Sequence, residues 1–401
     1  MRSMPRAEFI ALIAMMFATI AFSIDSMLPA LPEIGRELSP NDVNRAQLIL
    51  TAFVLGMGAG TFFVGPISDA FGRKPVILVG SAIYIAAAAV CMFVDSIEVL
   101  LAARLVQGLG ASGPRIVSLA IMRDLYSGRI MARMMSIAMM IFTVFPAFAP
   151  LIGSGIIAVL GWRGVFLAFI LFSIISSTWM ATRLPETLPK EKRRPFRPHL
   201  MFSALREMLQ HPTVRLSILV QSLCMSMLFI MLIMVQQVYD QVFDKADVFP
   251  LWFAGVALFS ALASFLNAAI VVKVGMRRIV TWVLLLQIVL SSVMAVSSEL
   301  PVHDSIDFAL FVVWQATLAF AVGTTLGNLN AISMEPMGHI AGMAASVIGS
   351  VSTVLAACIA TPIGLMYNGT IQPMVFGILT VSSAAFLLML KMKKVEDRQV
   401  V

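Results

Sequence analysis

The chain has 401 residues, of which 60% are hydrophobic and only 12% are charged. Soluble globular domains carry about twice that charged fraction, so the composition excludes a soluble enzyme and indicates a protein that lives in lipid. The net charge of +7 does not indicate nucleic acid, because the positive residues gather in short loops between apolar segments.

Apolar runs follow one another along almost the whole chain. A membrane-spanning helix needs roughly 20 mostly apolar residues, and the runs are continuous rather than alternating, which favours helices over a barrel. The first run is expected to be a retained helix rather than a cleaved signal peptide. We predict twelve spans, near residues 8–30, 46–66, 75–94, 97–122, 132–157, 162–183, 213–238, 248–272, 278–297, 306–330, 340–366 and 372–391.

The distribution of Lys and Arg predicts how the chain crosses the membrane. With this map, 22 of the 28 positive residues fall at the termini or in loops after even-numbered spans. Because positive loops stay on the cytoplasmic side, both termini are predicted to be cytoplasmic. We expect a multi-pass protein of the bacterial inner membrane.

One long polar interruption, 184–212, divides the spans into six plus six. It is rich in proline and contains a basic run, 190–197, which we interpret as a solvated cytoplasmic linker that also touches anionic lipid. The loop 72–78 of the first half recurs in degraded form at 275–280, with Val272 where the first copy has Asp69. We therefore predict an all-α membrane protein of two pseudo-symmetric six-helix bundles, 1–183 and 213–401, joined by the linker 184–212.

A polar turn joins the second and third predicted spans, with an acid and a base four residues apart. It resembles the signature Gly-x-x-x-Asp-Arg-x-Gly-Arg-Lys of the major facilitator superfamily, with Ala70 in place of the first Arg. The matching residues are Gly65, Asp69, Gly72, Arg73 and Lys74. The resemblance implies a cytoplasmic gate in which Asp69 pairs with Arg73 beside a helix N-terminus.

Asp25 is the only acidic residue well inside a predicted span. A lone carboxylate in hydrocarbon is costly, so it should be functional, paired or near water, and the first of these suits a proton carrier. The alternative is that the first helix ends earlier, since Pro29 and Pro32 follow closely, and that Asp25 lies at the wet interface.

The fourth predicted span carries a polar stripe, because Arg104, Gln107, Ala111 and Arg115 are spaced to share one helix face. Arg104 and Asp25 are expected at similar depth, which makes them candidate partners. A purely structural Arg104, bound to a loop carbonyl, is the alternative. Three glycines on the same span should allow another helix or a substrate to approach the backbone closely: Gly108, Gly110 and Gly113.

The fifth predicted span contains Pro146 and Pro150, which should bend it. Pro150 and Gly153 match part of a motif of the superfamily's exporters. The whole pattern is similar to the bicyclomycin and chloramphenicol resistance subfamily, through segments that begin at Asp25, Arg104, Ala149, Gly161 and Pro185. This resemblance implies drug and proton antiport, with Arg104 in proton coupling.

The second half offers mainly amides and methionines. Single amides more often join helices than contact ligands, and methionine suits both packing and pockets that accept varied shapes. The predicted substrate cavity is lined by Asp25, Arg104, Gln107, Ala111, Arg115, Pro146, Pro150, Met231, Asn267 and Gln315.

Nothing in the sequence resembles a nucleotide-binding loop, a zinc site or a hydrolase nucleophile. We therefore predict a monomeric secondary transporter, not an enzyme, that needs no cofactor or metal and no nucleic acid partner. It would export small amphipathic molecules by alternating access, with protons exchanged at Asp25 and Arg104 tuning that exchange.

Two alternatives remain within this interpretation. The chain would export or take up one specific metabolite or siderophore, or it would be a membrane sensor or assembly factor that transports nothing. Flux of several unrelated compounds separates the first alternative from multidrug export, and tolerance of neutral residues at positions 25 and 104 would indicate the second.

Overall fold

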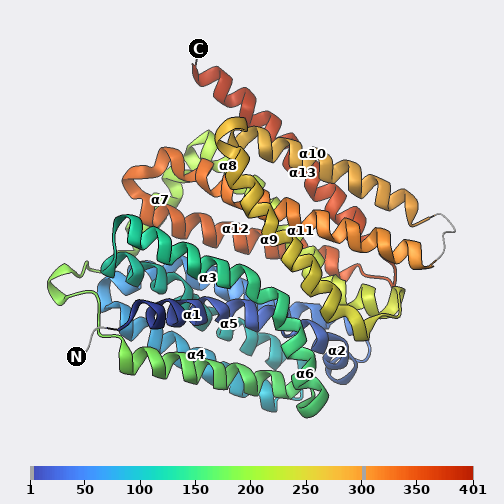
Figure 1. The fold of residues 1–401 in the computed structure, drawn as a ribbon, viewed down its shortest axis with the longest axis horizontal. Helices are drawn as coiled ribbons and strands as arrows, with labels where there is room; N and C mark the ends of the chain where they lie inside the picture. The colour runs from blue at the N-terminus through green and yellow to red at the C-terminus, as the bar shows by residue number, and fades with distance from the viewer. Residues whose placement is uncertain (1–3, 300–303, 401) are drawn as a thin grey trace. The chain divides into compact units, whose positions relative to one another are not determined.

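The computed structural model describes residues 4–299 and 304–400, and every regular element in that part of the chain is helical (Figure 1). It divides into two compact units, residues 1–198 and 199–401, and the division falls within the segment 184–212. The helices of the first unit are α1 Arg6–Asp25, α2 Leu31–Leu38, α3 Leu48–Phe71, α4 Arg73–Phe93, α5 Ile97–Leu125 and α6 Gly128–Arg183. Those of the second are α7 Pro198–Gln210, α8 Pro212–Gln237, α9 Phe249–Val274, α10 Met276–Ser297, α11 Asp304–Met334, α12 Ala341–Leu365 and α13 Gln372–Val400.

Ten helical stretches of the described residues are long and apolar enough to cross a membrane. Two of them, of 56 and 61 residues, exceed twice the length needed for a hydrocarbon core of about 30 Å. Each contains a break: Gly161 inside α6 has φ 65°, and a short 3₁₀ segment, Glu335–Ile340, separates α11 from α12. The all-helical membrane fold is confirmed, while the count of twelve crossings stays a prediction that these breaks support.

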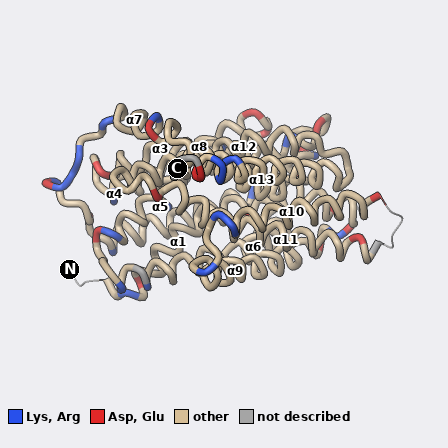
Figure 2. The backbone as a smooth tube through the Cα atoms, turned by 90° about the horizontal axis from the view of Figure 1, so that it is seen from above, with Lys and Arg blue, Asp and Glu red and all other residues tan. Residues whose placement is uncertain are grey.

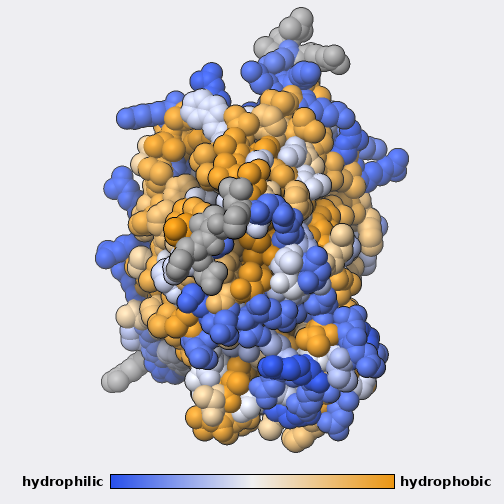
Figure 3. All heavy atoms as spheres, turned by 90° about the vertical axis from the view of Figure 1, so that its right-hand side faces the viewer, coloured by the Kyte–Doolittle hydropathy of each residue, from blue (hydrophilic) through white to orange (hydrophobic). Residues whose placement is uncertain are grey.

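Charge and hydropathy follow the pattern of a protein in lipid. Figure 2 shows charged residues mainly at helix ends, with long uncharged stretches between them. On α9, the large apolar side chains Leu262, Phe265 and Leu266 are half or more exposed, which suits contact with lipid tails. Where loops join the helices, Figure 3 shows hydrophilic side chains among apolar ones.

Two features of the helices were not expected from the sequence. The backbone keeps helical φ/ψ at Pro146 and Pro150, where a bend stays a prediction, while α6 has a non-helical break at Gly161, because glycine adopts a positive φ without steric cost. The polar segment 184–212 contains the helix α7, which buries Met201, Ala204 and Met208 along one face. This spacing is that of an amphipathic helix. The helix was not predicted, because proline and charged residues dominate the composition of the segment.

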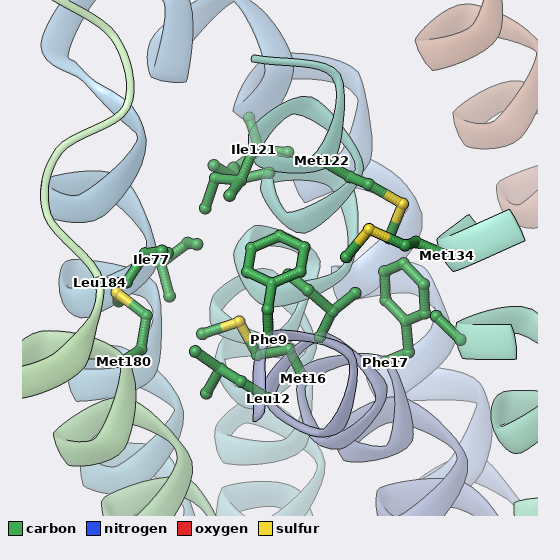
Figure 4. Close-up of a cluster of buried hydrophobic side chains, with 14 residues drawn as sticks. Phe9, Leu12, Met16, Phe17, Ile77, Ile121, Met122, Met134, Met180 and Leu184 are labelled. Carbon is green, nitrogen blue, oxygen red and sulfur yellow. The ribbon is translucent and has the colours of Figure 1, made fainter. Parts of the chain in front are cut away.

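A cluster of apolar side chains fills the interior of the first unit (Figure 4). Phe9 and Met16 of α1 meet Ile77 of α4 and Ile121 of α5, and α6 contributes Met180. All five side chains are at most 1% exposed. α1 is buried along most of its length and packs mainly against α6 and α5, while α4 packs against the same two helices.

Glycines on α5 bring its backbone close to two neighbours. A Cβ on Gly108 would lie 2.0 Å from the carbonyl oxygen of Phe53 on α3, and one on Gly110 would lie 2.5 Å from that of Gly80 on α4. No Cβ fits at such distances. The expected close approach is therefore confirmed at these two positions, whereas Gly113 has only ordinary contacts, at 3.5 Å and beyond.

Replacing Gly108 with alanine should destabilise the protein by about 1–3 kcal/mol, because its methyl group would push α5 away from a rigid carbonyl of α3. Gly113→Ala is the matched control and should be neutral or slightly stabilising, since alanine favours helix by up to about 1 kcal/mol. Thermal unfolding in detergent measures both. Equal effects of the two substitutions would contradict this account of the α3–α5 contact.

Candidate functional site

A fully buried arginine lies at the centre of the first unit. Arg104 of α5 is 0% exposed, and its guanidinium donates to the carbonyl of Ser23 at 3.0 Å, to that of Ile49 at 3.3 Å and to Oε1 of Gln107 at 2.8 Å. The ring of Phe53 faces it at 4.4 Å. These contacts supply several partners to a charge that would otherwise be isolated in a low dielectric. Arg104 thereby links α5 to α1 and α3.

The Ser23 carbonyl is available because of how α1 ends. In a continuing α-helix this carbonyl would accept from the amide of Met27. The Met27 amide instead donates to Ile24 at 3.3 Å, as the chain tightens into the 3₁₀ turn Leu28–Ala30. One carbonyl of the last turn is thus left without a helical partner. The Arg104 guanidinium donates to this carbonyl in place of the Met27 amide.

Tyr84 of α4 completes this polar centre. Its hydroxyl lies 2.5 Å from the hydroxyl of Ser23, and its side chain is 1% exposed. Ser23 therefore contacts α4 through its side chain and α5 through its carbonyl. Tyr84 was not predicted as a site residue, although a lone tyrosine in a span otherwise rich in alanine is a signal that could have indicated it.

Asp25 is the last residue of α1 and is 6% exposed. Its carboxyl makes no hydrogen bond or ion pair within the described part of the chain. The expected pairing with Arg104 is wrong: Arg104 binds the backbone two residues earlier, and side chains two positions apart on a helix point about 200° apart. The first helix does end early, as the alternative interpretation had it, but Asp25 is buried rather than at a wet surface.

The other predicted residues of α5 extend the same face. Gln107 and Ala111 are fully buried, and Gln107 orients Arg104 by accepting its Nη1 hydrogen. Arg115 is half-buried, with its guanidinium 5.8 Å from the ring of Phe142. On α6, Pro150 is buried and Pro146 half-buried.

The predicted gate is an ion-paired turn between α3 and α4. Arg73 donates to Asp69 at 2.5 Å, to the Ser68 hydroxyl at 2.7 Å and to Asp124 of α5 at 3.0 Å. Gly72 turns the chain with φ 104°, a conformation that other residues rarely adopt. The turn is thereby fixed to the cytoplasmic end predicted for α5.

Glu186 holds the other side of the turn. Its carboxylate accepts from the backbone amides of Arg73 at 3.0 Å and Lys74 at 3.1 Å, which are the first amides of α4. Lys74 in turn donates from Nζ to carbonyls at the end of α6, at Ala181 and Leu184. A carboxylate at a helix N-terminus satisfies free amides and matches the helix dipole. The sequence analysis assigned no role to Glu186 or Asp124, because nothing local shows that they meet Arg73.

The second unit repeats this arrangement in part. Gly275 has φ 90°, and Arg277 pairs with Glu335 at 3.2 Å and with Glu396 at 2.7 Å. Glu335 directly follows α11, much as Asp124 lies near the end of α5. Val272, 90% exposed, occupies the place of Asp69, so the second copy lacks that acid.

The remaining predicted residues of the second unit lie in helix contacts. Asn267 of α9 and Asn328 of α11 exchange amide hydrogen bonds, the shorter at 2.8 Å. Gln315 of α11 accepts from the Tyr239 hydroxyl at 2.9 Å, and Met231 of α8 is 3% exposed. The structure therefore brings Gln315 to a tyrosine that the sequence analysis did not single out.

Comparison with known proteins identifies the family. The sequence model of the Major Facilitator Superfamily matches residues 11–361. The chain belongs to the major facilitator superfamily. It is a transporter and not an enzyme. Over 363 residues, 88% of each chain, it is 30% identical to a bicyclomycin resistance protein homolog from Haemophilus influenzae.

Two further similarities bear on this major facilitator. A chloramphenicol resistance protein from Pseudomonas aeruginosa is 35% identical over 169 residues, which cover 42% of this chain and 40% of that protein. The crystal structure of a D-xylose-proton symporter matches the fold with a TM-score of 0.75 over 95% of this chain and 97% of that one. At 12% identity, this likeness shows the fold alone.

In this major facilitator, Glu186→Ala should speed hydrogen exchange at the amides of Arg73 and Lys74 and cost about 0.5–2 kcal/mol of stability, because the first turn of α4 loses its acceptor. Exchange mass spectrometry measures the first effect. Glu191→Ala, at an exposed linker position, is the control. Unchanged exchange at the start of α4 in Glu186→Ala would contradict the assigned contact.

Proposed function

We propose that the chain is a proton-coupled exporter of small amphipathic molecules that works by alternating access. It would act as a monomer in the bacterial inner membrane, with both termini in the cytoplasm and the proton gradient as its energy source. The named relatives support export, since one is a chloramphenicol resistance protein and another is a homolog of a bicyclomycin resistance protein. The distribution of positive loops supports the orientation.

The observation that carries the proposal is the environment of Asp25. Its side chain is buried and lacks an ionic or hydrogen-bonded partner among the described residues. A charged carboxylate in such surroundings is costly, whereas the protonated form is neutral and far easier to bury. A change in the water access of Asp25 therefore requires a proton to bind or leave. That is the elementary step of proton coupling.

Arg104 would set the electrostatic field at this end of α1. Its charge is held on the backbone of Ser23, two residues from Asp25, and not on another acid. Because α1, α3 and α5 all contribute acceptors to Arg104, a shift of α1 changes its hydrogen bonds. Protonation of Asp25 and movement of the surrounding helices would thus be linked through one side chain.

The turn around Arg73 would serve as the cytoplasmic latch. Asp69, Asp124 and Glu186 surround the start of α4, so the turn, α5 and the segment after α6 move together. Alternating access requires such rigid blocks, because each half of a transporter must rock as one body. The predicted cavity residues would supply the contacts for the substrate.

Asp25→Asn should abolish efflux driven by a pH gradient while substrate binding stays measurable, because asparagine keeps the shape of the side chain but cannot exchange a proton. Uptake of tetraphenylphosphonium into inside-out vesicles with an imposed gradient measures the first effect. Glu33→Gln changes an exposed acid on α2 and should transport like the wild type. Gradient-driven transport by Asp25→Asn would remove Asp25 from the mechanism.

Arg104→Lys should lower the transport rate by about tenfold although the charge is kept, since one ammonium cannot reproduce the fork that reaches acceptors on three helices. The same vesicles measure this rate. Wild-type transport by Arg104→Lys would mean that charge alone matters and that the three helix contacts do not.

A further inference from the structure

The second unit contains buried side-chain amides with hydrogen-bonding atoms that have no partner among the described residues. Gln221 and Gln236 of α8 and Gln315 of α11 are 8%, 5% and 0% exposed. Each leaves a buried side-chain atom without a hydrogen-bond partner among the described residues: Oε1 in the first two and Nε2 in Gln315. Away from water, an unpaired amide atom is unfavourable, so three in one unit call for partners from outside the chain.

Gln315 makes the clearest case. Its Oε1 accepts from the Tyr239 hydroxyl at 2.9 Å, which leaves Nε2 free. Reversing the amide would not remove the deficit, because a tyrosine hydroxyl serves one amide atom as donor or acceptor and the other atom then stays unpaired. One hydrogen-bonding position of Gln315 is therefore open in either orientation.

A π-helical turn places Tyr239. Val238–Val242 follows α8 directly, and the amide of Phe243 reaches back five residues to Val238 at 3.3 Å. The Tyr239 ring packs edge-on against Phe249 and Phe308, which leaves its hydroxyl to Gln315. Just after α12, the Tyr367 hydroxyl donates to the carbonyl of Gln237, the last residue of α8, at 3.2 Å. This hydrogen bond fixes the start of the π-helical turn.

Gln236 adds an acceptor at the end of α8. It is the second-last residue of that helix and precedes Tyr239 by three residues. All hydrogen-bonding groups of this cluster are neutral. The ammonium of Lys245 lies 5.2 Å from the ring centre of Phe308, on the aromatic side of the cluster.

The internal repeat gives independent support. Gln315 precedes Glu335 by the same number of residues, 20, as Arg104 precedes Asp124. Each acid pairs with an arginine near the start of the preceding long helix, Arg277 of α10 and Arg73 of α4, although Arg277 stands one position later in the repeat than Arg73. By its spacing from the acid, Gln315 corresponds to Arg104. The central position of the repeat is charged in the first unit and is a neutral amide in the second.

We propose that Tyr239, Gln315 and Gln236 form a hydrogen-bonding subsite for an uncharged group that carries both a donor and an acceptor, such as a secondary amide. This inference rests on the proposed transport function and names the chemical class that the second unit selects. The subsite supplies a donor from Gln315 and an acceptor from Gln236, beside an aromatic cluster that suits a planar ligand.

The test compares two probes. Chloramphenicol is uncharged and carries an amide, whereas tetraphenylphosphonium is a cation with no hydrogen-bonding group. Gln315→Met and Gln236→Met, which keep side-chain size and remove the amide, should raise the KM for chloramphenicol at least about fivefold in inside-out vesicles. The KM for tetraphenylphosphonium should not change.

Two controls separate this result from general damage. Gln287→Met replaces a buried glutamine of α10 whose amide already donates to Ser291 at 3.2 Å, and it should leave both KM values unchanged. Tyr239→Phe keeps the ring and removes the hydroxyl that positions Gln315, so it should weaken chloramphenicol transport selectively. Monodispersity in detergent identifies variants that fail to fold.

The subsite is overturned if the variants change the KM of both probes equally or leave the KM for chloramphenicol unchanged. It is also overturned if the wild type transports tetraphenylphosphonium but does not transport chloramphenicol. If the wild type moves neither probe, the proposed transport function fails, and equilibrium binding of labelled chloramphenicol to purified protein still decides the subsite. A higher Kd in Gln315→Met than in Gln287→Met supports it, and equal Kd values overturn it.

Discussion

The buried guanidinium of Arg104 is the interaction on which the first unit depends. An arginine that is fully removed from water must find acceptors, and here two of the three are backbone carbonyls of other helices. Close approach at Gly108 brings the α3 carbonyl within reach, and the tightened end of α1 frees the Ser23 carbonyl. The burial of the Arg104 charge therefore depends on where the first helix ends. Asp25 lies where it does because α1 ends there.

The two units share a plan but differ in chemistry. Each has a positive-φ glycine, an arginine after it, and acids that hold this arginine to the end of a neighbouring helix. The first unit adds Asp69 and Arg104 to this plan. The second has Val272 and Gln315 at the corresponding places. A duplicated scaffold thus offers charge in one half and neutral hydrogen bonds in the other, which fits a transporter whose proton step and substrate contacts are divided.

Much of this could be predicted from sequence where the signal is local. Apolar runs predict the helices, and the glycines of α5 predict close packing. The ion pair of Arg73 with Asp69 is implied by the resemblance of their turn to the superfamily's signature. Contacts between distant segments could not be predicted. Glu186 lies more than a hundred residues from the amides whose hydrogen bonds it accepts. Tyr239, which binds Gln315, lies in a π-helical turn that no residue pattern predicts.

The pairing of Asp25 with Arg104 failed for a related reason. Similar depth along α1 and α5 predicts that Arg104 comes near the last turn of α1, where it binds the Ser23 carbonyl, but depth does not fix which way the Asp25 side chain points. A difference of two residues turns a side chain by about 200°. The amphipathic helix α7 was missed because proline and charge dominated the composition of its segment, although its buried residues have regular helical spacing.

Proton release on substrate binding tests the central claim most directly. Tetraphenylphosphonium is added to weakly buffered, detergent-solubilised protein, and a soluble pH dye records protons that leave. The account predicts that the wild type releases protons on binding and that Asp25→Asn binds the cation without releasing any. Equal release from Asp25→Asn, or binding without release by the wild type, would contradict the assignment of Asp25 as the proton-exchanging group.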